Sequence, residues 1–94
     1  MWETLDTIGT RGSEDGIILR DEEYKQSCRI TLEECEDCCA ITCGVYGAMV
    51  HTAFCDKGDE TKYEAMKQEL QAFLETDMPS EEQYEFYKAF VLKY

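Results

Sequence analysis

Sulfur and the only imidazole gather in the middle of the chain. Five of the 6 cysteines and the single histidine lie between positions 33 and 55, in EECEDCCAITCGVYGAMVHTAFC. The spacing Cys35-x2-Cys38-x12-His51-x3-Cys55 matches that of zinc fingers whose last ligand is a cysteine. Zinc prefers four such ligands in a tetrahedron. The spacing alone therefore predicts a zinc site made of Cys35, Cys38, His51 and Cys55.

The residue types around His51 argue against that site. In a zinc finger the last two ligands lie on a helix, where residues four apart share a face. Here AMVHTAFC is β-branched, aromatic and uncharged, which favours a strand. In a strand, His51 and Cys55 would lie roughly 13 Å apart, at about 3.3 Å per residue, which is too far to bind one ion. We therefore expect no cofactor, and a zinc-binding protein is the first alternative.

The pair Cys35 and Cys38 also forms a C-x-x-C dithiol motif. A reactive dithiol needs a thiolate stabilised by a cation or a helix N-terminus. Acidic residues crowd positions 33–37 instead, and nearby negative charge raises a thiol pKa. A thiol-based redox protein is thus the second alternative. Three further cysteines are expected to pack as small hydrophobic side chains: Cys28, Cys39 and Cys43.

No complete catalytic motif is present. His51 is the only candidate for a general base, and Cys43 on the partner strand is a candidate nucleophile. The chain contains no G-x-S-x-G, P-loop, glycine-rich dinucleotide loop or H-E-x-x-H motif. The acidic runs also lack the pattern of a calcium loop. We assign no catalytic residue and favour a protein that is not an enzyme.

The chain is strongly acidic, with a formal net charge of -12 and a pI of about 4.3. Nucleic acids and anionic membranes attract clustered Lys and Arg, so neither is an expected partner. The charge-free stretch from Cys38 to Cys55 approaches the length of a membrane span. Because it contains His51 and has acidic flanks, we interpret it as a buried strand pair.

The segment MWETLDTIGT has neither the positive charge nor the long apolar run of a secretory signal. We therefore expect a cytoplasmic protein with reduced cysteines. A secreted disulfide framework is the alternative for an even number of cysteines.

Hydrophobic periodicity predicts one α+β domain over residues 1–94, in the order β-β-β-β-α-α, with residues 1–15 as a loosely ordered arm. GIILR and CRITLE are predicted to be strands. Apolar and polar residues alternate in CRITLE, which indicates an antiparallel meander with one buried face. Residues 39–55 form a hairpin that turns at GVYG. With an even loop, Ile41 pairs with Val50 or Thr52, whereas an odd loop would exchange these partners.

Two helices are expected to follow and to pack on one face of the sheet. Between positions 60 and 76, apolar residues recur at helical spacing opposite Glu and Lys. A second helix should start at about Glu81, with Ser80 and Gln83 as a capping box. The apolar residues of the first helix are Tyr63, Met66, Leu70, Phe73 and Leu74.

The second helix is apolar over more than half of its circumference. Such a helix is either deeply buried or meets another chain, and Tyr and Phe are enriched in interface cores. We favour a homodimer, with packing inside the chain and a basic protein partner as alternatives. The expected function is a non-catalytic interaction module that self-associates. Its predicted interface residues are Tyr84, Tyr87, Phe90, Val91 and Tyr94.

Overall fold

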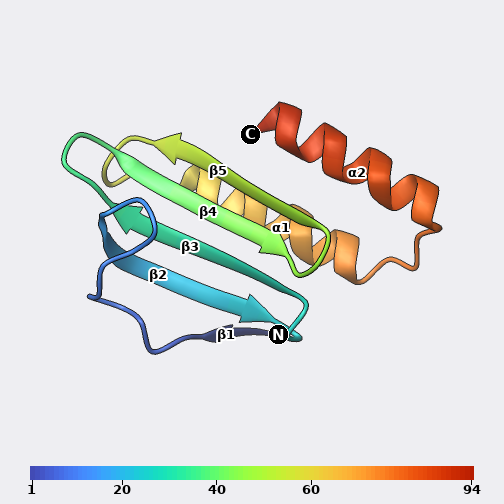
Figure 1. The fold of residues 1–94 in the computed structure, drawn as a ribbon, viewed down its shortest axis with the longest axis horizontal. Coiled ribbons are helices and arrows are strands. Elements are labelled where there is room, and N and C mark those ends of the chain that lie inside the picture. The colour runs from blue at the N-terminus through green and yellow to red at the C-terminus, as the bar shows by residue number, and fades with distance from the viewer.

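A five-stranded antiparallel sheet backed by two helices forms the fold of the computed structural model, which describes residues 1–94 (Figure 1). The strand order in the sheet follows the chain, so the sheet is a meander. This confirms the predicted α+β arrangement, with one strand more than expected. The elements are β1 Trp2–Thr4, β2 Ile17–Tyr24, β3 Cys28–Glu34, β4 Cys39–Val45, β5 Met49–Cys55, α1 Thr61–Leu74 and α2 Ser80–Lys93.

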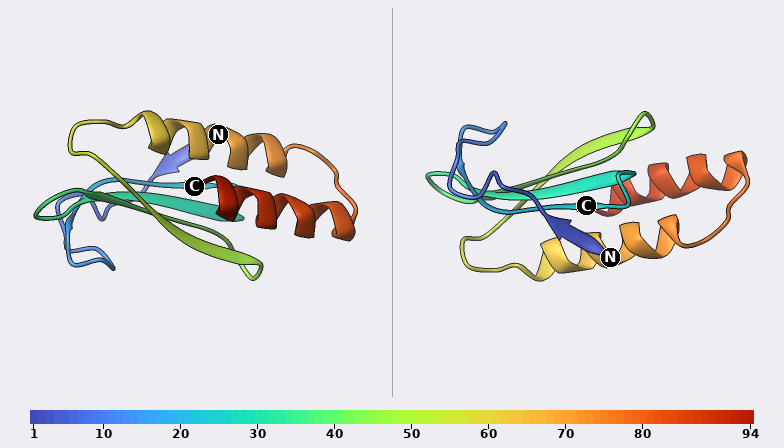
Figure 2. Two further views of the ribbon diagram at one scale, coloured as in Figure 1. Left: turned by 90° about the horizontal axis from the view of Figure 1, so that it is seen from above. Right: turned by 90° about the horizontal axis from the view of Figure 1, so that it is seen from below.

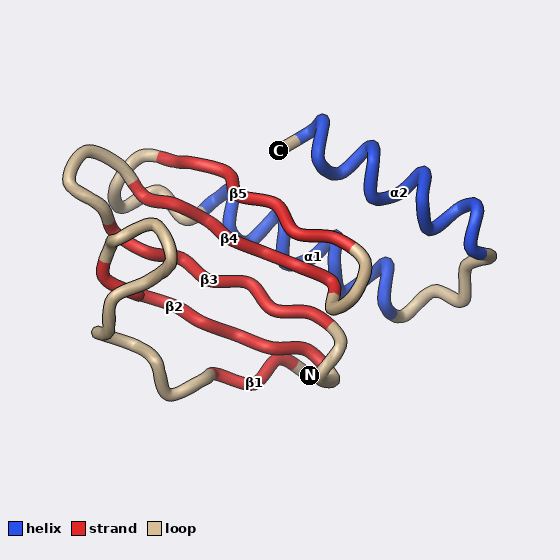
Figure 3. The backbone as a smooth tube through the Cα atoms, viewed as in Figure 1, coloured by secondary structure: helices blue, strands red, loops and turns tan.

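The additional strand, β1, comes from the predicted arm and forms one edge of the sheet (Figure 3). Trp2 pairs with Tyr24 of β2, and the two rings lie 5.2 Å apart. The Trp2 indole N–H also donates a hydrogen bond of 2.9 Å to Gln71 Oε1 on α1. The arm is therefore attached both to the sheet edge and to a helix.

Strand β2 is longer than predicted and contains a bulge. Ile18 pairs with Glu33 while Arg20 pairs with Leu32, which leaves Leu19 as an extra residue. The bulge reverses the direction of the side chains, so Ile18 lies on one face of the sheet and Arg20 on the other.

The β4–β5 hairpin turns through three residues, Tyr46 to Ala48. The Ala48 N–H donates to the Val45 carbonyl at 2.9 Å, and Gly47 has a φ of 77°, which favours glycine. The loop is odd and Ile41 pairs with Ala53, so the pairing with Val50 or Thr52 expected for an even loop does not form and the odd-loop alternative holds. The first glycine of GVYG is not in the turn but inside β4.

The hydrophobic core lies between the sheet and α1, on what we call the helix-covered face (Figure 2). Helix α1 buries four of the five apolar residues predicted for it. Fully burying one such side chain contributes about 2 kcal/mol. As expected, sulfur takes part in this packing, because three free cysteines are buried in the core: Cys28, Cys39 and Cys43.

Helix α2 starts without the predicted capping box. Pro79 is the N-cap residue, Ser80 is already helical, and no side chain caps the helix. Gln83 instead donates from Nε2 to the Met78 carbonyl at 2.8 Å. Phe90 anchors the helix in the core, with only 2% of its surface exposed. Each helix has 14 residues, and neither is long and apolar enough to cross a membrane.

Candidate functional site

The four residues with zinc-finger spacing do not meet at one point: Cys35, Cys38 and Cys55 lie toward one end of the sheet, where Cys55 pairs with Cys39, and His51 lies farther along β5. Cys35 and Cys38 flank the turn between β3 and β4, where the Cys35 N–H donates to the Cys38 carbonyl at 2.8 Å. His51 and Cys55 lie four residues apart on β5, so roughly 13 Å separates their positions along the strand. The structure has no group of three or more His, Cys, Asp or Glu side chains arranged to hold a metal ion.

Five of the six thiols have raised pKa values. Burial raises the pKa of Cys28 to about 11 and that of Cys43 to about 12. Burial also raises the pKa of Cys35, Cys39 and Cys55, and nearby acidic groups add to the effect. Since the thiolate is the nucleophile, these groups are poor nucleophiles near neutral pH.

His51 faces the helices and lies opposite Cys43 in the β4–β5 register. Its ring meets Phe90 edge-on, with 6.4 Å between the ring centroids. The Nε2 atom is buried and has no hydrogen-bond partner in the protein. Although the hairpin places His51 and Cys43 on one face, the raised thiol pKa does not favour Cys43 as the nucleophile of such a pair.

The five predicted interface residues divide between two sides of α2. Phe90 is buried, Tyr87 packs edge-on against Phe73 at 5.3 Å, and the Tyr94 hydroxyl donates to a Glu69 carboxylate oxygen. Tyr84 and Val91 point away from the core, with 63% and 40% of their surfaces exposed. The next residue, Leu92, was not predicted as an interface residue and is 86% exposed.

The other face of the sheet, the open face, contains a buried carboxylate that the sequence did not reveal. Asp21 is fully buried and accepts hydrogen bonds from Arg29 Nε at 2.8 Å and Nη2 at 2.5 Å. The hydroxyls of Thr31 and Thr7 also donate to it. Burial opposes ionisation of Asp21, but these hydrogen bonds outweigh it and lower the pKa of the carboxyl group. Asp21 therefore fixes the orientation of Arg29.

A second buried carboxylate, Glu33, fastens the 5–16 loop to the open face. Its oxygens accept hydrogen bonds from the N–H of Gly16 at 2.8 Å and from that of Glu14 at 3.1 Å. Gly12 lies so close that an added Cβ would stand 2.7 Å from the Glu33 carboxylate. The alternation of β3 predicts the face that Glu33 occupies, but it gives no sign that a loop covers this residue.

A third carboxylate, Glu22, lies at the margin of the helix-covered face. It accepts hydrogen bonds from Lys67 Nζ at 2.6 Å, Tyr63 Oη at 2.8 Å and Arg20 Nη2 at 3.0 Å. Burial opposes its ionisation, but the contacts with Lys67, Tyr63 and Arg20 together lower its pKa. The contacts with Lys67 and Tyr63 join β2 to α1.

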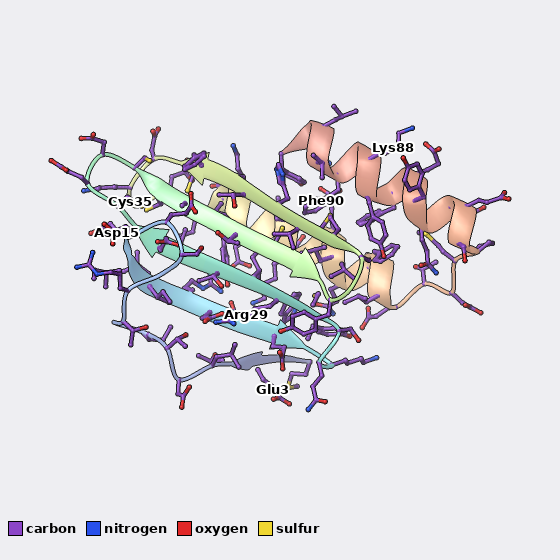
Figure 4. The ribbon with its side chains drawn as sticks, in the orientation of Figure 1. Glu3, Asp15, Arg29, Cys35, Lys88 and Phe90 are labelled. Atoms are coloured by element: carbon purple, nitrogen blue, oxygen red, sulfur yellow. The ribbon has the colours of Figure 1, made fainter.

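The open face is hollowed between the 5–16 loop and the β4–β5 turn, and both rise on the side away from the helices (Figure 2). The hollow has a volume of about 750 Å³. Its floor includes Thr31, Thr42 and Gly44, and Arg29 projects from β3 on this face (Figure 4).

Two surfaces thus stand out as candidate sites: the outward side of α2, with Tyr84, Val91 and Leu92, and the hollow on the open face. No protein-family model, curated protein or solved structure matches the chain. The function is therefore inferred from this chain's own residues.

Proposed function

We propose that this protein is a non-catalytic interaction module that pairs with a second copy of itself through the outward side of α2. The observation that supports this most is the exposure of Tyr84, Val91 and Leu92, at 63%, 40% and 86%. Tyr84 and Val91 are two helical turns apart and share one side of the helix. A cluster of exposed apolar side chains on one side of a helix is typical of a contact surface.

The charges along α2 suit an antiparallel pair. Glu81, Glu82 and Glu85 occupy its first half, and Lys88 and Lys93 its second half. In a twofold antiparallel pair, the acidic half of each helix faces the basic half of the other. This complementarity favours the pair in a chain whose net charge of -12 otherwise opposes association.

The spacing also predicts which residues meet. If the twofold axis passes midway between Tyr84 and Val91, each Tyr84 packs on Val91 of the second copy. Phe90 then remains in the core of its own chain, and Tyr87 and Tyr94 remain packed against that core.

Sedimentation across a dilution series tests the proposal. We expect the parent to dimerise and Val91→Glu to be monomeric at every concentration, with the Tm of the parent diluted to its monomeric state, because Val91 does not support the core. Ile8→Glu is the matched control, since Ile8 is 47% exposed and lies outside α2. A parent that sediments as a monomer throughout overturns the proposal.

A pair of complementary variants tests the antiparallel geometry. Tyr84→Lys and Val91→Glu should each weaken the homodimer, because each places a charge against an apolar partner. Mixing the two variants should restore a heterodimer, in which the new lysine meets the new glutamate at one contact and Tyr84 meets Val91 at the other. Failure of the mixture to associate, while the parent does, would rule out this pairing and leave a different dimer geometry.

A further inference from the structure

We propose that the hollow on the open face binds a small organic carboxylate with an apolar body. This inference does not depend on the proposed dimer, because no residue of α2 lines the hollow. Its volume of about 750 Å³ falls within the range of pockets that bind small molecules, roughly 300 to 1,000 Å³.

The lining of the hollow has no acidic side chain, in contrast to the chain as a whole. The protein has 21 acidic residues and 9 basic ones, yet none of the 17 residues that line the hollow is Asp or Glu. Two of its three arginines, Arg11 and Arg29, are among them. Each arginine has a carboxylate partner outside the lining, Asp15 for Arg11 and Asp21 for Arg29, and its remaining N–H groups are available to a small anion.

Arg29 is held in position to receive that anion. Asp21 binds its Nε and Nη2 atoms from below, and Nη1 has no acceptor in the protein. A guanidinium fixed on one edge presents its remaining N–H groups in a set direction, and these suit the planar oxygens of a carboxylate. Arg11 adds a second, mobile positive charge, because its side chain is 65% exposed and its one ion pair, to Asp15, is at the surface.

Thr42 supplies a polar group that lacks a partner. It lies on the floor of the hollow, and its Oγ1 atom is buried without a hydrogen-bond partner in the protein. A buried hydroxyl without a partner is unfavourable. Rotation about χ1 turns the hydroxyl toward the hollow, where a ligand oxygen would satisfy it.

The rest of the lining selects an organic anion over an inorganic one. Ile18 and Val50 line the hollow with apolar side chains, and Val50 is 80% exposed. Phosphate sites are typically built from backbone N–H groups at helix N-termini. Neither helix contributes a residue to the lining, so the hollow has no such element.

Benzoate, with benzyl alcohol as its neutral counterpart of similar size, tests the proposal by titration of amide signals in NMR spectra. We expect benzoate to shift the amides of residues 7–13 and 42–50 saturably, and benzyl alcohol to bind at least about tenfold more weakly, because it lacks the charge-assisted bonds to Arg29. Equal binding of the two compounds, or benzoate shifts scattered over the whole surface, overturns the proposal.

Two variants that leave the fold intact locate the binding. Arg11→Gln should weaken benzoate about two- to fivefold, as expected for an exposed charge. Thr42→Val keeps the shape, should weaken benzoate to a similar degree, and should leave Tm unchanged or higher because it removes the hydroxyl without a partner. Lys57→Gln, outside the hollow, is the control for loss of one positive charge and should bind as the parent does. Unchanged affinity in both Arg11→Gln and Thr42→Val overturns the proposed site.

Discussion

Ile30 and Thr31 are neighbours in β3, yet their side chains enter two different environments. Ile30 is fully buried against α1 in a core of aliphatic, aromatic and sulfur-containing side chains. Thr31 points to the open face, where it donates to the buried carboxylate of Asp21. One side of the sheet is stabilised by burial of apolar surface, and the other by charge-assisted hydrogen bonds.

The two faces should therefore respond to different perturbations. The helix-covered face depends on side-chain volume, so cavities should weaken it at any pH. The open face depends on ionised carboxylates, so acid should weaken it although no side-chain volume is removed. This separation also suits a hollow that recognises an anion, because the hydrogen-bonded groups beneath it are polar and fixed.

The largest expected effect comes from Ile41→Ala on the helix-covered face. Ile41 is fully buried between β4 and the helices, so the variant should lose about 3 kcal/mol of unfolding free energy in a denaturant titration. The loss should be the same at pH 7 and pH 4. Val50→Ala, on the exposed side of the neighbouring strand, should cost less than about 0.5 kcal/mol. A loss below about 1 kcal/mol for Ile41→Ala would contradict the packing described here.

On the open face, Asp21→Asn should cost about 2 kcal/mol at pH 7, because an amide cannot accept both hydrogen bonds from Arg29. The pKa of Asp21 is lowered in the folded state, so its contribution is complete above the unfolded pKa of about 4. That contribution is lost as pH falls from about 5 through the lower folded pKa.

The parent should therefore lose stability over this acid range, and Asp21→Asn should lose less. Denaturant titrations between about pH 3 and pH 7 measure both slopes. Glu22 has a lowered pKa too, so part of the acid sensitivity remains in the variant. Asp15→Asn, at an exposed ion pair, is the control and should follow the parent. Parallel curves for the parent and Asp21→Asn would show that Asp21 does not contribute in this way.

The sequence predicted the helix-covered face far better than the open one. Alternation in CRITLE and the helical spacing of Tyr63, Met66 and Leu70 identify buried positions. This works because apolar side chains are buried at the period of the strand or helix that carries them. Asp21 and Glu33 are buried only because a distant loop and Arg29 provide hydrogen bonds. Acidic residues are usually exposed, so no local pattern reveals such partners.

The hairpin and α2 show two further limits of the sequence. An even and an odd number of residues in the GVYG loop each gave a plausible pairing of the two strands. The structure has the odd case, a three-residue turn with Gly47 at positive φ. In α2 the apolar width was correctly recognised, but which residues face the core depends on how the helix docks. Phe73 of α1 decides this, since it packs against Phe86 and Tyr87.

A more local effect is expected for Glu33→Gln. The amide keeps one acceptor oxygen, so the sheet should remain folded while the loop loosens, at a cost of about 1 kcal/mol. Hydrogen exchange measures this directly: the Gly16 amide, which donates to Glu33, should exchange faster, and the Ile41 amide inside the sheet should not. Glu34→Gln, at the exposed end of β3, is the control. Unchanged exchange at Gly16 would mean that the carboxylate does not hold the loop.

The smallest expected effect is a low reactivity of the buried thiols. Their reactivity tests whether these cysteines pack in the core or act as nucleophiles. Cys28 and Cys43 have pKa values of about 11 and about 12 because of burial, so both remain protonated at pH 8. Iodoacetamide should modify these two only when the whole protein unfolds. The rate of their modification should therefore fall as the free energy of unfolding rises. Cys38, half-buried in the β3–β4 turn, is the internal comparison and should react in the folded state. A thiol that ionises below about pH 7 would instead favour redox chemistry.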